Sequence, residues 1–350
     1  MSAATLEHVT ETAGVVDAVR RAVRRRTILV VSLVLVVVVV VTAVALSIGD
    51  YMLSPDALWR TLWGGGARIE SYVLFQVRAP RVAMALVAGG ALGLAGALLQ
   101  SLLGNPLASP DLLGISGGSG LVAVFALLVI GTTGPLLAIG AFAGGIAVAG
   151  LLLLAGRAQL DGGYRLILAG IGVSFLCAAA IDFLLVRAKV EQAQTALLWL
   201  TGSLSSTPWW QVVTVAAVFL ASIPAIAVSA RWLPIVQLGP STASALGVRP
   251  GVVRVTTVIV AVLLTSVTCA FLGPISFIAL CAPAIARPLL GHGAIGVGTS
   301  ALVGSALLAS ADLIAQFGIP GLQVPVGVVT GALGAVFLLW LLATSKGRHL

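Results

Sequence analysis

Charged residues are scarce in this sequence. Asp, Glu, Lys and Arg make up only 9% of its 350 residues, and hydrophobic residues make up 59%. A soluble domain carries about 25% charged residues, so the composition excludes that class and predicts an integral membrane protein. The net charge of +8 does not indicate nucleic-acid binding, because the positive charges lie mostly in loops and at segment ends, where they orient a membrane protein.

The residues that carry most catalytic chemistry are also few. Cys177, Cys269 and Cys281 lie in apolar segments without metal-ligand spacing, so we expect inert packing thiols. The histidines lie in the tails and one loop. The only lysines, Lys189 and Lys346, follow no glycine-rich turn, so a phosphate-binding loop is absent and the chain cannot itself be an ATPase. We therefore predict a chain without enzymatic activity, cofactor or metal.

Long apolar segments are what the sequence has in abundance. A spanning helix needs about 20 apolar residues. The sequence thus predicts an all-α, polytopic membrane protein with about ten transmembrane helices. Only Gly273 separates the seventh and eighth segments, so one long kinked helix is the alternative there. The segments are 27–48, 80–103, 112–131, 135–155, 165–186, 209–230, 253–272, 274–290, 294–317 and 325–344.

Positive charges favour one orientation. Five arginines precede the first segment at positions 20–26, so residues 1–26 are predicted to be a basic cytoplasmic tail and 27–346 a single transmembrane domain. With ten spans and both termini inside, 13 of the 19 lysines and arginines fall on the cytoplasmic side. Nine or eleven spans would place one terminal cluster on the wrong side.

Carboxylates are rare inside the apolar segments. Of all the aspartates and glutamates, only Asp182 and Asp312 lie inside these segments, and both lie near predicted external ends. A proton-coupled carrier needs carboxylates at mid-membrane to bind and release the coupling proton. The sequence therefore argues against a secondary carrier.

Two stretches interrupt the apolar pattern. "GNPLASPDLLGISGGSG" (104–120) is either a tight inter-helix turn or a backbone break that lines a pathway. Within it, Ser109 is predicted to cap the next helix, with Pro110 in its first turn. In 231–252, "STASALGV" lies between Gly-Pro and Arg-Pro pairs, which predicts a compact cytoplasmic helix-turn unit.

Several ordered motifs carry a resemblance to a known family. They are "VRAPRVAMALVAGGALGLAGALLQSLLGNPLASPDLLGISGGSG", "LILAGIGVS", "WLTGSLS", "ALGVRPGVVR", "GPISFIALCAPAIAR", "SADLIAQ" and "VPVGVVTGALGAVFLLWLL". Over roughly residues 27–346 the chain resembles the FecCD family, the membrane subunits of ATP-driven importers for iron–siderophore complexes, haem and vitamin B12. The resemblance implies the type II ABC importer permease fold with ten spans and both termini inside.

The resemblance also implies partners. Two such permease subunits, identical or paralogous, would form a pathway at their interface above a cytoplasmic ABC ATPase dimer. The loop at 239–250 is similar to the coupling helices that contact the ATPase. It implies contacts at Leu246, Gly247 and Val248. From the residues alone, a plain surface connector is equally open.

Docking of an extracytoplasmic substrate-binding protein is implied at Arg78 and Arg81, which resemble external family arginines. Charge-assisted pairs would set the register of docking. Snorkelling at the membrane interface is the alternative. In "SADLIAQ" the family often has an arginine where this chain has Gln316, so docking is expected to be less electrostatic or to use Arg68 or Arg187.

The implied pathway is lined by the second, third, fifth and eighth segments, and a glycine pair between the fourth and fifth would form an inner gate. Helix–helix packing is the alternative role for the serines. The pathway candidates are Gln100, Asn105, Pro106, Ser116, Ser119 and Ser174, and the gate candidates are Gly162 and Gly163.

The predicted function is thus that of a permease subunit that imports a ferric siderophore across the cytoplasmic membrane of a bacterium. An importer of haem or a cobalamin with the same architecture is the alternative. Ala284 and Gly104 depart from the family pattern and argue against vitamin B12. A secondary carrier or efflux channel is the alternative from another class.

Overall fold

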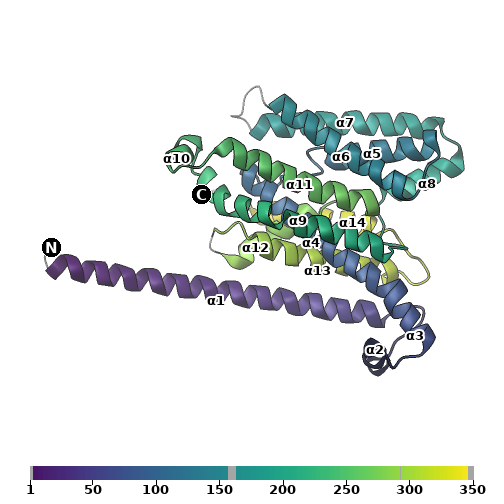
Figure 1. Ribbon diagram of the computed structural model, residues 1–350, viewed down its shortest axis with the longest axis horizontal. Coiled ribbons are helices and arrows are strands. Elements are labelled where there is room, and N and C mark those ends of the chain that lie inside the picture. The colour runs from purple at the N-terminus through teal and green to yellow at the C-terminus, as the bar shows by residue number, and fades with distance from the viewer. Residues whose placement is uncertain (1–2, 157–162, 292, 346–350) are drawn as a thin grey trace.

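The computed structural model describes residues 3–156, 163–291 and 293–345, and these residues form a bundle of helices (Figure 1). No β-strand forms within these ranges, so the predicted all-α class is confirmed. The elements are α1 (Ala3–Ser47), α2 (Pro55–Leu62), α3 (Arg68–Tyr72), η1 (Val73–Arg78), α4 (Ala79–Leu103), α5 (Ile115–Phe125), η2 (Ala126–Ile130), α6 (Pro135–Gly156), α7 (Gly163–Arg187), α8 (Val190–Leu200), α9 (Trp209–Val236), α10 (Pro240–Ala245), α11 (Pro250–Leu272), α12 (Ile278–Leu290), α13 (Val297–Phe317) and α14 (Val326–Ser345).

The helices match the predicted apolar segments. Among the described residues, seven helices are long and apolar enough to cross a membrane. Three shorter apolar helices, Ile115–Ile130, Ile278–Leu290 and Val326–Leu341, coincide with the remaining segments. α11 and α12 are separate helices, so the alternative of one long kinked helix is wrong. The short helices α2, α3 and α8 in the connections were not predicted.

α4 lies at the centre of the bundle and is the most buried of the candidate spans. α9, α11, α12 and α13 pack around it, and α13 makes the most extensive contact. A Cβ on Gly89 or Gly93 would overlap backbone carbonyls of α13, at Gly304 and Ser300 respectively. Small residues let helix backbones approach closely, which is how helices associate in lipid. The packing therefore explains part of the high glycine content.

α5, α6, α7 and α8 form a second layer beside this core (Figure 1). α5 and α6 meet at Gly118 and Gly144, where an added Cβ on either glycine would overlap the other's carbonyl. α7 is largely uncovered, and Phe175, Leu176 and Val186 are 73%, 70% and 85% exposed. Such an apolar face requires lipid or another subunit as a neighbour.

α1 is one continuous rod that includes both the predicted tail and the first predicted span (Figure 1). Its 45 residues correspond to about 68 Å, roughly twice the thickness of a hydrocarbon core. Arg26 lies where the two parts meet and donates to the carbonyls of Leu289 and Pro288, at 2.9 and 3.3 Å. These carbonyls end α12, so the arginine satisfies orphan acceptors of a helix C-terminus.

The segment 273–277 breaks the chain between α11 and α12. Gly273 and Phe277 both have positive φ, 74° and 70°, and Phe277 is in the left-handed conformation. The Phe277 ring fills the space beside Gly334 on α14, where a Cβ would collide with it. A left-handed phenylalanine is strained, and this packing holds it in place.

Candidate translocation and coupling sites

Short helices distinguish the two ends of the bundle. We call the end that carries α10 the coupling end, and the opposite end, which carries α2 and α3, the α2 end (Figure 1). Because α4 runs from the α2 end to the coupling end, its last residues and the turn after it lie at the coupling end.

A polar cavity of about 340 Å³ lies at the coupling end of α4. Three of the predicted pathway residues, Gln100, Asn105 and Pro106, line it together. Gln100 donates to the carbonyl of Leu280 at 3.2 Å, while its Oε1 atom is buried without a partner. The remaining lining residues are Ser101, Gly104, Gln237, Arg287, Gly293, Ala294 and Ile295.

The turn after α4 is built by side-chain hydrogen bonds. Gly104 ends α4 in the left-handed region, with φ of 61°. Asn105 Oδ1 accepts from the backbone N–H of Leu107 at 2.9 Å, and Ser109 Oγ accepts from that of Leu112 at 3.4 Å. Ser109 therefore caps a turn within 110–113, and the prediction that it caps the next helix is wrong. α5 begins six residues after Ser109, at Ile115, and Gly114 with φ of 76° forms its N-terminal boundary.

Asp111 is predicted to lie in a loop, whereas the structure places its partly buried side chain against the start of α5. Its carboxylate accepts from the Ser116 hydroxyl at 2.5 Å and from the backbone N–H of Phe277. Phe277 immediately precedes α12, whose 13 residues place its start about 20 Å from the coupling end. The N-termini of α5 and α12 thus converge on one carboxylate.

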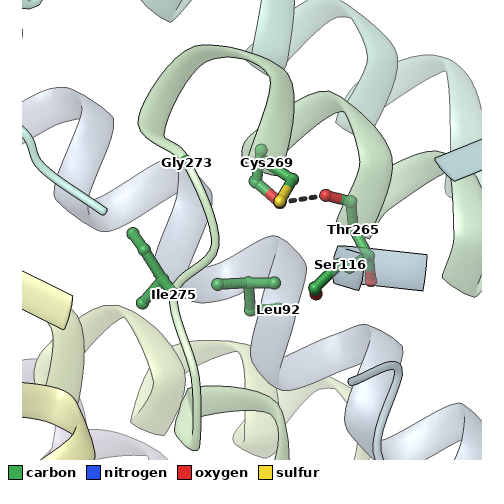
Figure 2. Close-up of a pocket in the computed structure, with 7 residues that line it drawn as sticks. Leu92, Ser116, Thr265, Cys269, Gly273 and Ile275 are labelled. Atoms are coloured by element: carbon green, nitrogen blue, oxygen red, sulfur yellow. Dashed lines mark hydrogen bonds between the residues drawn. The ribbon is translucent and has the colours of Figure 1, made fainter. Parts of the chain in front are cut away.

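A second, small cavity of about 10 Å³ adjoins this site, with room for about one water molecule (Figure 2). Ser116 lines it from α5, and Thr265 and Cys269 line it from α11 (Figure 2). The hydroxyls of Thr265 and Ser119 are buried without a hydrogen-bond partner. Of the predicted pathway serines, Ser116 and Ser119 therefore lie among α5, α6 and α11, inside this chain, rather than on an open surface.

Ser174 and Gly163, two further candidates, lie on α7. Ser174 donates to the carbonyl of Gly170 at 2.9 Å and packs beside Gly114 at the start of α5. Gly163 is the first residue of α7, and Gly162 lies outside the described residues. The gate assignment therefore stays a prediction.

Arg78 is occupied within its own chain. Its guanidinium donates to the carbonyls of Leu46 and Ser47 at 2.8 and 3.1 Å and to that of Tyr51 at 2.5 Å. Leu46 and Ser47 end α1, so the arginine caps that helix and fixes the chain after it. Arg187, named above as another docking cation, lies 4.6 Å over the ring of Phe183.

Arg81 and Gln316 also have partners inside the chain. Arg81 forms an ion pair with Asp312 on α13 at 2.8 Å, and the two side chains are only 19% and 5% exposed. Gln316 donates to the same carboxylate at 2.8 Å. The predicted docking residues thus lie together at the α2 end, where they connect α1, α4 and α13.

The loop at 239–250 forms the predicted helix-turn unit. α10 spans Pro240–Ala245, and its buried Ala243 packs with the buried Val248 in the core beside α9 and α11. Leu246 is 60% exposed, whereas Val248 is only 6% exposed. Leu246 and Gly247 therefore present the surface that a partner can reach, and Val248 holds the unit to the bundle.

The chain belongs to the FecCD transport family, whose model matches residues 34–344. It is therefore similar to polytopic permeases of ABC transporters. It is 40% identical to the ferric enterobactin transport system permease protein FepG of Escherichia coli (strain K12), over 85% of this chain and 90% of that one. It is 32% identical to the hemin transport system permease protein HmuU of Yersinia pestis, over 87% of this chain and 94% of the relative.

A solved structure shows the same fold. It is an inward-facing conformation of a metal-chelate type ABC transporter, with a TM-score of 0.80 and 26% identity. The match covers 89% of this chain and 97% of the other. The permease fold predicted from the sequence is thereby confirmed.

Proposed function

We propose that the chain is the permease subunit of an ATP-driven importer that moves a ferric siderophore across the cytoplasmic membrane of a bacterium. The observation that carries this proposal is α10, a short helix with exposed Leu246 that is packed rigidly onto the core of a FecCD-family chain. A surface of this kind suits a partner that pushes on the bundle. The cargo class follows from the similarity to a ferric enterobactin permease.

The arrangement of partners follows from the same features. The coupling end would face the cytoplasm and an ABC ATPase dimer, and both termini would lie on that side. The apolar face of α7 would contact lipid or a second permease subunit, identical or paralogous. An extracytoplasmic binding protein would dock at the α2 end, close to Arg78, Arg81 and Gln316. Because these three side chains have partners inside the chain, their part in docking would be to hold that surface in shape.

The buried carboxylates support an ATP-driven importer over a secondary carrier. Asp312 is paired with Arg81, and Asp111 accepts hydrogen bonds at the starts of two helices. Both carboxylates are therefore held by fixed partners inside the chain, whereas a carrier needs a carboxylate that is free to take up and release the coupling proton.

An importer of haem is the second candidate, because the hemin permease is also a relative with nearly complete coverage. Uptake of labelled ferric siderophore and of haem by a deletion strain, with and without the wild-type gene, separates the two. Loss and restoration of ferric siderophore uptake supports the proposal. Loss of haem use alone would transfer the assignment to haem and contradict the siderophore cargo.

A further inference from the structure

The last turns of α4 form a junction between helices that are distant in sequence. Ser101 is buried there, and its hydroxyl donates to the carbonyl of Ala97 at 2.7 Å. Its own carbonyl lies in the final turn of the helix, where carbonyls have no intrahelical partner. It therefore needs a partner from outside the helix, either another part of the chain or water.

Gln237 satisfies that carbonyl. Its Nε2 atom donates to the oxygen of Ser101 at 2.7 Å. Gln237 forms the C-terminal boundary of α9, and only Leu238 and Gly239 separate it from α10. Gly239 has φ of 107°, which only glycine adopts readily, and Pro240 follows, so this link is a defined turn rather than a slack tether.

Arg287 completes the junction from α12. Its Nη2 atom donates to Ser101 Oγ at 2.9 Å and to the carbonyl of Ala97 at 3.0 Å. Its Nε atom donates to the carbonyl of Ile295 at 3.3 Å, in the loop before α13. One buried serine therefore joins the chain leading into α10 to the ends of α4 and α12.

The same residues form the wall of the 340 Å³ cavity that Gln100, Asn105 and Pro106 also line. Two hydrogen bonds link the chain leading into α10 to this cavity, one donated by Gln237 to the Ser101 carbonyl and one donated by Arg287 to the Ser101 hydroxyl. Ala243 and Val248 attach α10 to the bundle by apolar packing beside α9 and α11.

We propose that Gln237, Ser101 and Arg287 are positioning residues that carry the movement of α10 to α4 and α12 and so change the shape of the cavity. The inference rests on the proposed function for the source of the movement, which is the ATPase. Gln237 and Ser101 belong to the permease and not to the ATPase, so their removal should lower transport while ATP hydrolysis continues.

The test uses the complete transporter, with its ATPase, in proteoliposomes, and measures ferric chelate transported per ATP hydrolysed. Gln237→Leu removes the amide and keeps the side-chain size. Loss of one hydrogen bond to the junction predicts a fall in this ratio of about threefold to tenfold while hydrolysis continues. Gln211→Leu, at the opposite end of α9, is the matched control and should leave the ratio unchanged. An unchanged ratio in Gln237→Leu would overturn the proposal.

Ser101→Ala is the second variant, because it keeps the backbone carbonyl and removes only the hydroxyl that Arg287 contacts. If the two bonds act in one path, the double variant should be no worse than the more affected single variant. Additive losses would contradict a shared path.

A measurement without cargo separates this inference from the proposed function. Spin labels at Ser244→Cys on α10 and Leu289→Cys on α12 report the distance between the two helices; both sites are exposed, and the three native cysteines are buried. The wild-type complex should keep one narrow distance with and without ATP and vanadate, since the helices move together. In Gln237→Leu, the distribution of this distance should broaden when ATP and vanadate are present. Identical distance distributions in both proteins would contradict the proposed role of Gln237, Ser101 and Arg287, even if no ferric chelate is transported.

Discussion

Arg81 on α4 binds both oxygens of the Asp312 carboxylate on α13 through its Nε and Nη2 atoms. Arg81 Nε lies 2.9 Å from Asp312 Oδ2, and Nη2 lies 2.8 Å from Oδ1. This is the bidentate geometry in which arginine and carboxylate interact most strongly. Since the two helices form the most extensive contact in the bundle, the pair fixes their register at the α2 end.

Removing one partner of this pair should destabilise the protein strongly. Arg81→Met or Asp312→Leu leaves a charge without its counter-charge in a largely buried site, and we expect a loss of about 3–5 kcal/mol in the free energy of unfolding. Denaturation in detergent, followed by tryptophan fluorescence, measures it. The double variant should recover most of the loss. A double variant as unstable as the sum of the single variants would show that the pair does not act as a unit.

Asp111→Asn should weaken the contact between the starts of α5 and α12. The amide keeps one acceptor oxygen and replaces the other with a donor NH2 group, which weakens the contacts with Ser116 and Phe277, so we expect a loss of about 1–3 kcal/mol in unfolding free energy. Asp182→Asn is the control, because Asp182 lies exposed on α7. Equal stability of Asp111→Asn and the wild type would contradict the assigned hydrogen bonds.

Gly96→Ala should disrupt the contact between α4 and α12. A Cβ at Gly96 would overlap the carbonyl of Ala279, and backbone cannot move aside as a flexible side chain can. We expect a loss of about 3 kcal/mol, measured as a lowered denaturation midpoint in detergent. Gly150→Ala on α6 meets nothing within 4 Å and should be neutral or slightly stabilising. A Gly96→Ala protein as stable as Gly150→Ala would contradict the close approach of the two helices.

Leu246→Arg should abolish coupling without disturbing the fold. The side chain is exposed, so the substitution changes only the surface offered to the ATPase, and uptake should fall by about tenfold or more. Gly247→Arg is less informative, because Gly247 has φ of 77° and any side chain there strains the backbone. Leu322→Arg, exposed at the α2 end, is the control for membrane insertion and is expected to assemble normally. Full uptake with Leu246→Arg would exclude this contact.

The helical segments could be predicted from the sequence because each is a long apolar run, and the unit at 239–250 because proline and glycine bound it on both sides. The break after α11 was harder to place. Gly273 and Pro274 mark where α11 ends, but α12 starts only after Phe277, whose left-handed conformation depends on the space beside Gly334. That space exists only in the folded bundle.

The side-chain partners were less accessible to sequence reasoning. Asp312 and Arg81 carry opposite charges in apolar segments, and that signal could have suggested a pair. Asp111 follows Pro110 in a polar stretch, and nothing local distinguishes a surface turn from a segment that runs back into the bundle. The contacts of Ser101 with Gln237 and Arg287 span 136 and 186 residues of sequence, so they follow only from the arrangement of helices.

The central claim is that ATP hydrolysis at the coupling end drives import. The most direct measurement is uptake of radiolabelled ferric siderophore into right-side-out membrane vesicles that contain the complete transporter, with and without internal ATP. We predict uptake that requires ATP, persists when a protonophore collapses the proton gradient, and is lost in Leu246→Arg. Uptake that follows the proton gradient in vesicles without ATP would contradict the account.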